Sequence, residues 1–186
     1  MIKYLIVLLS FIPALLIGQA NKSDSSGSNI IYQQEKINIY KMNIGGGIAS
    51  KGFGSLSSLM YNDENSCYIL RYSNTTEFNI FGPVPEETLW DIGLLYGWNS
   101  RYFDYGIGLS YVNLTKRGVF LRHFNGFLSF DEYQKITLEK LGVPIQIELS
   151  GPWCSFFGVA IIAFANLNTV ESFAGLVVAI EIGKLK

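Results

Sequence analysis

Cysteine, histidine and charged residues are all scarce in this sequence of 186 residues. The two cysteines, Cys67 and Cys154, are too few for a disulfide scaffold, and no His or Cys residues are spaced to hold zinc. Charged residues make up 16% of the chain and the net charge is −1, so there is no clustered basic face of the kind that binds nucleic acid. We therefore expect no metal, no cofactor and no nucleic-acid partner.

Long apolar runs are scarce as well. Residues 1–20 have the composition of a secretory signal peptide, with Lys3, an apolar stretch over 5–17 and small residues around a cleavage point after Ala20. That stretch is too short for a spanning helix, although an uncleaved anchor is the alternative, and no later segment reaches the ~18 apolar residues of a transmembrane helix. Residues 21–38, which open with NKSDSSGSN, are expected to form a periplasmic N-terminal segment.

What the sequence does have is strict alternation. In the segment 89–113, LWDIGLLYGWNSRYFDYGIGLSYVN, apolar or aromatic residues alternate with small or charged ones on both sides of Asn99-Ser100. A period of two predicts strands and not helices. Aromatic residues at the ends of an apolar face, on strands of about ten residues, are typical of a chain that crosses lipid. The segment therefore predicts a transmembrane β-hairpin.

The same alternation continues along the rest of the chain. It predicts six further strands, at about 39–49, 53–62, 66–76, 137–149, 153–165 and 171–183. A helix is the alternative for 153–165, where an apolar run has no clear period, but its Phe, Val and Ile content favours a strand. With the hairpin, the fold class is all-β: an eight-stranded antiparallel up-and-down transmembrane β-barrel over residues 39–186.

The connections test this topology. Short turns at 63–65, 99–101 and 150–152 would be periplasmic, while the external connections at 50–52, 77–87, 115–136 and 166–170 include both long ones. Short inner turns and longer outer loops are typical of outer-membrane barrels. Aromatic residues expected at the two lipid interfaces are Tyr61, Tyr68, Trp90, Trp98, Tyr102, Tyr111, Trp153 and Phe173.

The small side of the strands should line a lumen that side chains can fill. On this register the lumen holds Arg71, Asp91, Asp104, Lys140, Glu148 and Glu181. Buried charges are tolerated only when paired, so we expect an ion-pair network that plugs the barrel. Asp91 and Asp104 are interpreted as structural carboxylates and not as an acid–base pair. Both cysteines take inward positions on strands that face each other across the lumen, so two free thiols are expected.

The connection 115–136 combines aromatic and basic residues. Lys116, Arg117, Arg122 and His123 are candidates for contact with lipopolysaccharide phosphates or with an extracellular partner, and folding back over the rim is the simpler alternative. His123, the only histidine, lies near Ser129, Asp131 and Glu132, a set that could deacylate lipid. An exposed histidine without catalytic function is the simpler interpretation, so no enzyme is expected.

In these features the chain resembles the small outer-membrane β-barrel proteins of Gram-negative bacteria, of the OmpX/OmpA-barrel type. The resemblance covers 39–186 and depends on the signal peptide, the eight amphipathic strands, and stretches such as LLYGWNSRYFDYGIGLSYV and FANLNTVESFAGLVVAIEIGKLK. It implies a location in the cell outer membrane and contact with its lipid and lipopolysaccharide. We expect a monomer.

The resulting hypothesis is a structural or interaction barrel with a plugged lumen, whose function is carried by loops 77–87 and 115–136. One alternative is a soluble secreted barrel for an apolar ligand, which requires the row from Trp90 to Trp98 to point inward. The other is a lipid-modifying outer-membrane enzyme that uses His123.

Overall fold

The structure is a computed structural model that describes residues 39–63, 66–78, 82–100, 103–125 and 129–185. The signal peptide expected at 1–20 and the periplasmic segment expected at 21–38 lie outside these residues. The strands are β1 (Ile39–Ala49), β2 (Gly52–Asp63), β3 (Ser66–Thr76), β4 (Thr88–Asn99), β5 (Phe103–Phe124), β6 (Phe130–Pro152), β7 (Phe157–Asn168) and β8 (Phe173–Lys184). Within the described ranges, no helix is long and apolar enough to cross a membrane.

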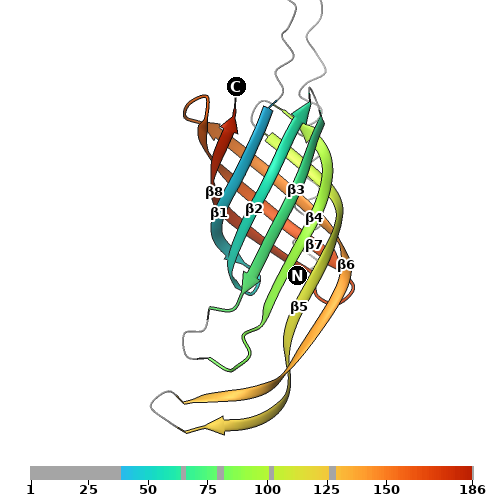
Figure 1. The fold of residues 1–186 in the computed structure, drawn as a ribbon, viewed down its shortest axis with the longest axis vertical. Coiled ribbons are helices and arrows are strands. Elements are labelled where there is room, and N and C mark those ends of the chain that lie inside the picture. Colours follow the sequence, from blue (N-terminus) through green and yellow to red (C-terminus); the bar gives the residue numbers. More distant parts are fainter. Residues whose placement is uncertain (1–38, 64–65, 79–81, 101–102, 126–128, 186) are drawn as a thin grey trace, which may run out of the picture. The chain divides into compact units, whose positions relative to one another are not determined.

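The strands close into a barrel in chain order (Figure 1). Each strand pairs antiparallel with the next, and β1 closes the ring by pairing with β8 from Tyr40↔Lys184 to Ala49↔Gly175. The predicted all-β, eight-stranded up-and-down barrel is therefore confirmed. Two strands begin later than expected, β7 at Phe157 and β8 at Phe173. Residues 153–156 form a turn instead, in which the Trp153 and Cys154 amides donate to the Phe157 carbonyl.

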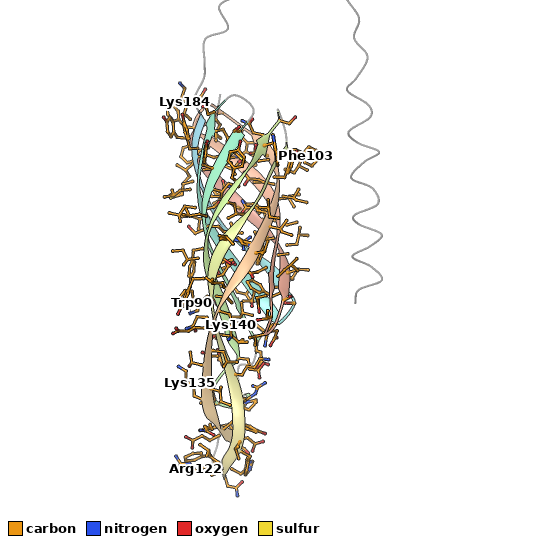
Figure 2. All side chains as sticks on the ribbon, turned by 90° about the vertical axis from the view of Figure 1, so that its right-hand side faces the viewer. Trp90, Phe103, Arg122, Lys135, Lys140 and Lys184 are labelled. Carbon is orange, nitrogen blue, oxygen red and sulfur yellow. The ribbon has the colours of Figure 1, made fainter. Side chains whose placement is uncertain are left out.

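Burial alternates along the strands with the period that the sequence predicts. On β4, Leu94 is 69% exposed, whereas its neighbour Leu95 is 3% exposed and Asp91 is fully buried. On the other strands, many large apolar side chains likewise project outward around the barrel (Figure 2). An exterior of Leu, Ile, Val and aromatic residues is stable only against lipid, since in water it would be a very large exposed apolar patch.

The barrel interior contains apolar as well as charged residues. One buried apolar cluster joins side chains from five of the strands, and a smaller one lies between β2, β3 and β4. Their members are Leu56, Leu89, Val112, Leu114, Ala160, Ile162, Phe164, Phe173, Val177 and Ala179, and then Met60, Cys67, Ile69 and Leu95. Both clusters therefore pack side chains from several strands against one another inside the barrel.

Close approach of two strands explains one of the glycines. A Cβ atom on Gly108 of β5 would lie 1.8 Å from the carbonyl oxygen of Leu94 on β4. No side chain can occupy that space without moving the backbone. The abundance of glycine in the sequence therefore has a packing reason at this position.

The largest departure from the sequence prediction is the segment 115–136. It was expected to be a loop, but β5 continues to Phe124 and β6 starts at Phe130. We call the part of β5 and β6 beyond the barrel, Lys116–Phe124 with Phe130–Ile136, the arm (Figure 1). Figure 2 shows Arg122 and Lys135 on the arm, farther from the barrel than Trp90 and Lys140. Two register shifts occur in the arm, between Arg117 and Phe120 and between Phe120 and Arg122.

Candidate functional site

One cluster of buried polar side chains lies at the end of the lumen where β1 begins, and it is centred on Lys41. Its Nζ lies 2.7 Å from Asp104 Oδ2, 2.5 Å from Glu148 Oε1 and 3.1 Å from Glu181 Oε1. It also donates to Ser150 Oγ at 2.9 Å. All three carboxylates are at most 6% exposed, so one ammonium faces three buried carboxylates. We call these residues the Lys41 cluster.

Neutral side chains also donate hydrogen bonds to these carboxylates. Glu148 Oε2 accepts hydrogen bonds from Asn43 Nδ2 at 2.8 Å and from Gln146 Nε2 at 3.2 Å. Ser150 donates to Glu181 Oε1 at 2.8 Å. Such donors are needed because a buried carboxylate without partners is strongly destabilising. The cluster therefore connects β1, β5, β6 and β8 across the lumen.

A second buried group lies farther along the lumen and pairs Arg71 of β3 with Asp91 of β4. The Arg71 Nη2 atom lies 2.6 Å from Asp91 Oδ2, and both side chains are fully buried. Arg71 also donates to the Ile145 carbonyl at 2.9 Å, and Asp91 accepts from Ser73 and Asn166. Asp91 and Asp104 thus lie in separate clusters, each with its own cation, and not as a catalytic pair.

Five of the six charges predicted for the lumen are therefore buried inside it, but Lys140 is not. Its position on β6 has inward parity, opposite buried Val112, yet its side chain is exposed. The reason is its position along the barrel axis. Pairing of β6 with β7 ends at Gly142, opposite Asn168, and Lys140 lies beyond that point, where no neighbouring strand covers it. Lys41, which sequence reasoning missed, provides the second lumenal cation.

The outer mouth of the barrel carries a network of ion pairs, which we call the rim network. Lys51 in the β1–β2 turn contacts Glu87 at 2.8 Å and Glu171 at 2.7 Å, and Glu171 contacts Lys116 at 2.6 Å. Arg117 contacts Glu77 at 2.7 Å. Since β5 and the β7–β8 turn are not neighbours around the ring, the Lys116–Glu171 pair joins non-adjacent parts of the mouth.

The charges of the rim network shift one another's titration. The hydrogen bond from Lys51 holds the pKa of Glu87 below its usual value. For Glu171, partial burial opposes this effect, but hydrogen bonds from Lys116 and Lys51 outweigh burial and lower its pKa. The hydrogen bond to Glu77 raises the pKa of Arg117. Each of these shifts favours the charged form of its residue.

One face of the arm is aromatic and ionic. Phe124 and Phe130 stack with ring centroids 4.9 Å apart, and Arg122 lies over the Phe124 ring at 4.3 Å while pairing with Glu132. The β6 edge is held by the β3–β4 connection, since the Val84 amide donates to the Asp131 carbonyl and the Tyr133 amide donates to the Val84 carbonyl. These contacts hold the arm as a defined hairpin.

The opposite face of the arm tip brings together three residues that the sequence placed in one loop. His123 Nδ1 lies 2.5 Å from Asp131 Oδ1, and Ser129 Oγ lies 3.2 Å from His123 Nε2. The His123 and Asp131 side chains are 46% and 43% exposed. All four basic or imidazole side chains proposed for phosphate contact, at 116, 117, 122 and 123, have carboxylate partners in the structure.

Aromatic side chains form two groups on the barrel exterior. At the inner end, rings contact one another in sequence from β1 to β5, with centroids 4.9 to 6.1 Å apart: Tyr40, Tyr61, Tyr68, Tyr96, Trp98 and Tyr105. At the outer end, Trp90 contacts Tyr72 and Tyr111. These two groups lie where an outer-membrane barrel carries its aromatic girdles.

Among the predicted interface aromatics, one is wrong and another lies in a turn. Phe173 is wrong as a lipid-facing residue: it is 3% exposed and packs inside the barrel against Phe164, with centroids 6.3 Å apart. Trp153 is exposed in the β6–β7 turn and not on a strand. Tyr102 lies outside the described residues. Both cysteines are free, but only Cys67 is buried, and Cys154 is exposed in the same turn as Trp153.

The described residues contain no cluster of three or more His, Cys, Asp or Glu side chains arranged to hold a metal.

The orientation of the strand faces tests the alternative of a soluble barrel that binds an apolar ligand. That alternative required Trp90 to Trp98 inside and the charges outside, whereas Trp98 is 48% exposed and Arg71, Asp91 and Glu148 are fully buried. The class defined by the fold and its surface is therefore a membrane-spanning eight-stranded barrel.

Comparison with known proteins agrees with this class. No family model matches the sequence, and a search of curated proteins finds no match. The structure is similar to the N-terminal β-barrel domain of Pseudomonas aeruginosa OprF, with a TM-score of 0.51 and 8% identity over 80% of this chain and 99% of that one. It is also similar to Neisserial surface protein A (NspA), with a TM-score of 0.53 and 13% identity over 78% and 96%.

A third similar structure is Ail, the attachment invasion locus protein of Yersinia pestis, in complex with the heparin analogue sucrose octasulfate. Its TM-score is 0.47, with 8% identity over 78% of this chain and 97% of that one. At these identities the similarity is one of fold. The chain has the fold of the small bacterial outer-membrane β-barrels, as the sequence resemblance implied.

Proposed function

We propose that the protein is an outer-membrane barrel of structural and interaction type, in which a closed barrel anchors the arm and the arm binds a partner outside the cell. The observation that carries this proposal is the exposed apolar surface of the arm. Val119, Phe120 and Leu121 are 69%, 50% and 55% exposed on a segment that extends beyond the barrel. Large apolar side chains in water, with no lipid to cover them, are typical of an interaction site.

The bracing of the arm supports this role. Arg117 pairs with Glu77, Val84 pairs with the β6 edge, and aromatic rings contact across the two strands. A surface held in one conformation loses less conformational entropy on binding than a flexible loop does. The side chains of Lys116, Arg117, Arg122 and His123 are already paired with carboxylates, so apolar and aromatic contact is favoured over recognition of lipopolysaccharide phosphates. The aromatic girdles of the barrel, and not the arm, make the contacts with lipid.

The closed lumen supports an anchor and not a channel. The Lys41 cluster, the Arg71–Asp91 pair and the rim network each connect strands or turns across the interior or the mouth. A purified, refolded barrel in planar bilayers should therefore give no stable large current. A 16–18-stranded porin reconstituted in the same way serves as the positive control. A steady large conductance from this protein would contradict the closed lumen.

The arm can be removed at a point that the register defines. Arg117 and Lys135 are cross-strand partners, so an Asn-Gly turn can join them and delete the arm beyond while retaining Lys116 and Arg117 for the rim network. The shortened protein should insert into membranes and show the same heat-modifiable gel migration as the full chain.

Binding to an array of polysaccharides and matrix proteins should then distinguish the two. We expect the full chain to bind a member of the array and the shortened chain to lose that binding. Equal binding by both proteins, or failure of the shortened chain to insert, would show that the arm serves something other than recognition.

A further inference from the structure

The arm tip places Ser129, His123 and Asp131 on the face opposite the Phe124–Phe130 stack. The register brings two of them together. His123 and Asp131 are direct cross-strand partners. Ser129 lies just before the first residue of β6, Phe130, where its hydroxyl reaches His123. Their side chains form a continuous chain of hydrogen bonds, 2.5 Å from His123 Nδ1 to Asp131 and 3.2 Å from His123 Nε2 to Ser129 Oγ.

This order of contacts is the one that activates a serine hydroxyl. When Asp131 accepts a hydrogen bond from Nδ1–H, the imidazole is held in the neutral tautomer whose Nε2 carries a lone pair. Nε2 then faces the Ser129 hydroxyl and can accept its proton. We propose that Ser129 is a nucleophile toward carboxylic esters, with His123 as the general base and Asp131 as the positioning residue.

The reaction balances with water as the only co-reactant. Ser129 Oγ bonds to the ester carbonyl carbon while its proton passes to His123 Nε2, and the bond from that carbon to the leaving alkoxide breaks as the alkoxide takes the proton. Water then attacks the acyl-serine, gives a proton to Nε2, and releases the acid as Ser129 regains its proton. No electrons are transferred to or from an external reagent.

Contacts on both sides of the three residues keep this geometry. The carbonyl of Asp131 accepts a hydrogen bond from the Val84 amide at 2.8 Å, so the strand that carries the carboxylate is held at its outer edge. On the other face, the Phe124–Phe130 stack and the Arg122–Glu132 pair hold the two strands together. The histidine is therefore fixed by strand pairing and does not depend on a flexible loop.

The position of the site defines the substrate class. It lies on the arm, beyond the barrel surface that contacts lipid, and nearly half of the His123 side chain is exposed. The substrate class is therefore an accessible ester in water, such as an acyl group on a polysaccharide, and not a lipid ester within the membrane. Because the site is open to water, its rate enhancement is small compared with that of an enclosed active site.

A fluorophosphonate probe tests the nucleophile directly, since it forms a stable phosphonyl ester with an activated serine and releases fluoride. The full-length protein, folded in detergent, is treated with the probe and the modified residue is identified by peptide mass spectrometry. We expect labelling at Ser129 and none in Ser129→Ala. His123→Ala should slow the labelling about 100-fold, the usual contribution of a general base. Ser172→Ala, at an exposed serine of the β7–β8 turn, is the matched control and should label at the wild-type rate.

The positioning role of Asp131 has its own measurement. Asp131→Asn should slow labelling, and Asp131→Glu should restore part of the rate, whereas a purely structural carboxylate would not affect the rate at all once folding is intact. Heat-modifiable gel migration checks that each barrel is folded. The same rank order should hold for hydrolysis of p-nitrophenyl acetate.

Several results would overturn the proposal. These are no labelling of Ser129, equal labelling of Ser129 and Ser172, or an unchanged Ser129 rate in His123→Ala. Release of fatty acid from lipopolysaccharide vesicles, without hydrolysis of the water-soluble ester, would also overturn the assigned substrate class.

Discussion

Replacing Arg71 with methionine tests the buried pair at the centre of the lumen. Methionine is long and unbranched, so it fills much of the same space next to the Phe164 ring, which lies 5.8 Å from the guanidinium. The substitution removes the 2.6 Å contact with Asp91 and the hydrogen bond to the Ile145 carbonyl. It leaves a fully buried carboxylate without its cation.

The expected cost follows from what Asp91 retains. Breaking a buried ion pair by removing one partner costs about 3–5 kcal/mol. Asp91 still accepts hydrogen bonds from Ser73 and Asn166, so we expect the lower end of that range, about 3 kcal/mol. Adding Asp91→Asn to Arg71→Met removes the unpaired charge. The two substitutions should therefore show a coupling energy of about 2 kcal/mol.

The assay is urea unfolding of the refolded barrel in detergent or thin-bilayer vesicles, followed by heat-modifiable gel migration. Arg122→Met is the matched control. It also removes an arginine from an ion pair, but that side chain is 63% exposed on the arm, so the free energy of unfolding should change by less than about 1 kcal/mol.

Equal effects of Arg71→Met and Arg122→Met would contradict a stabilising role for the buried Arg71–Asp91 pair. So would additivity of Arg71→Met and Asp91→Asn, because the buried charges would then not depend on each other. Either result would mean that Arg71 and Asp91 are hydrated separately in the lumen.

Three further predictions concern other parts of the barrel. Gly108→Ala should destabilise it by about 1–3 kcal/mol in the same urea assay, because the added Cβ meets the Leu94 carbonyl, whereas Gly151→Ala, with its nearest contact at 3.4 Å, should be neutral. Cys154 should react with maleimide in the folded protein and Cys67 only after unfolding, so equal rates would contradict the burial of Cys67. Because folding lowers the pKa of Glu87, its stabilising effect is complete above the unfolded value of about 4.3 and is lost as pH falls through the lower folded value. Pepsin should therefore cleave the arm faster below about pH 4 than at pH 5 when rates are normalised to an unstructured peptide, and no acceleration would count against the rim network.

The barrel could be predicted from sequence because lipid and lumen impose opposite requirements on alternate residues. Where both environments are present, as along β4 and β8, alternation gave the strands and their faces. The same parity already placed Phe173 inside, together with Val177 and Glu181. Assigning Phe173 to the lipid interface relied on residue type at the expense of parity.

The arm was missed because neither lipid nor lumen surrounds it. Beyond Thr115 both faces meet water, so no strict alternation is required there. The register shifts between Arg117 and Arg122 also break what parity remains. Cross-strand pairs such as Phe120–Tyr133 stabilise the extension, but such pairs are recognisable only once the two strands are known to be opposite each other.

Prediction of the lumenal residues failed where it depended on position along the barrel axis as well as on the inward or outward alternation of the strand. Parity alone directs Lys140 inward, but the ends of neighbouring strands determine whether an inward side chain is covered. Lys41 could have been found from its place near the inner end of β1, where Asp104, Glu148 and Glu181 needed a cation. The contact of His123 with Ser129 and Asp131 could not be derived from a segment interpreted as a loop.

The lipid-facing exterior of the barrel is tested most directly by finding which face of β4 contacts lipid. Single cysteines at Leu94 and Leu95, in a background with Cys67→Ser and Cys154→Ser, are labelled with an environment-sensitive fluorophore and reconstituted in brominated lipid. Leu94 is 69% exposed and Leu95 is 3% exposed, so we expect strong quenching at 94 and little labelling or quenching at 95. Quenching at 95 with none at 94 would mean that the two faces of β4 are reversed, and it would contradict the lipid-facing exterior.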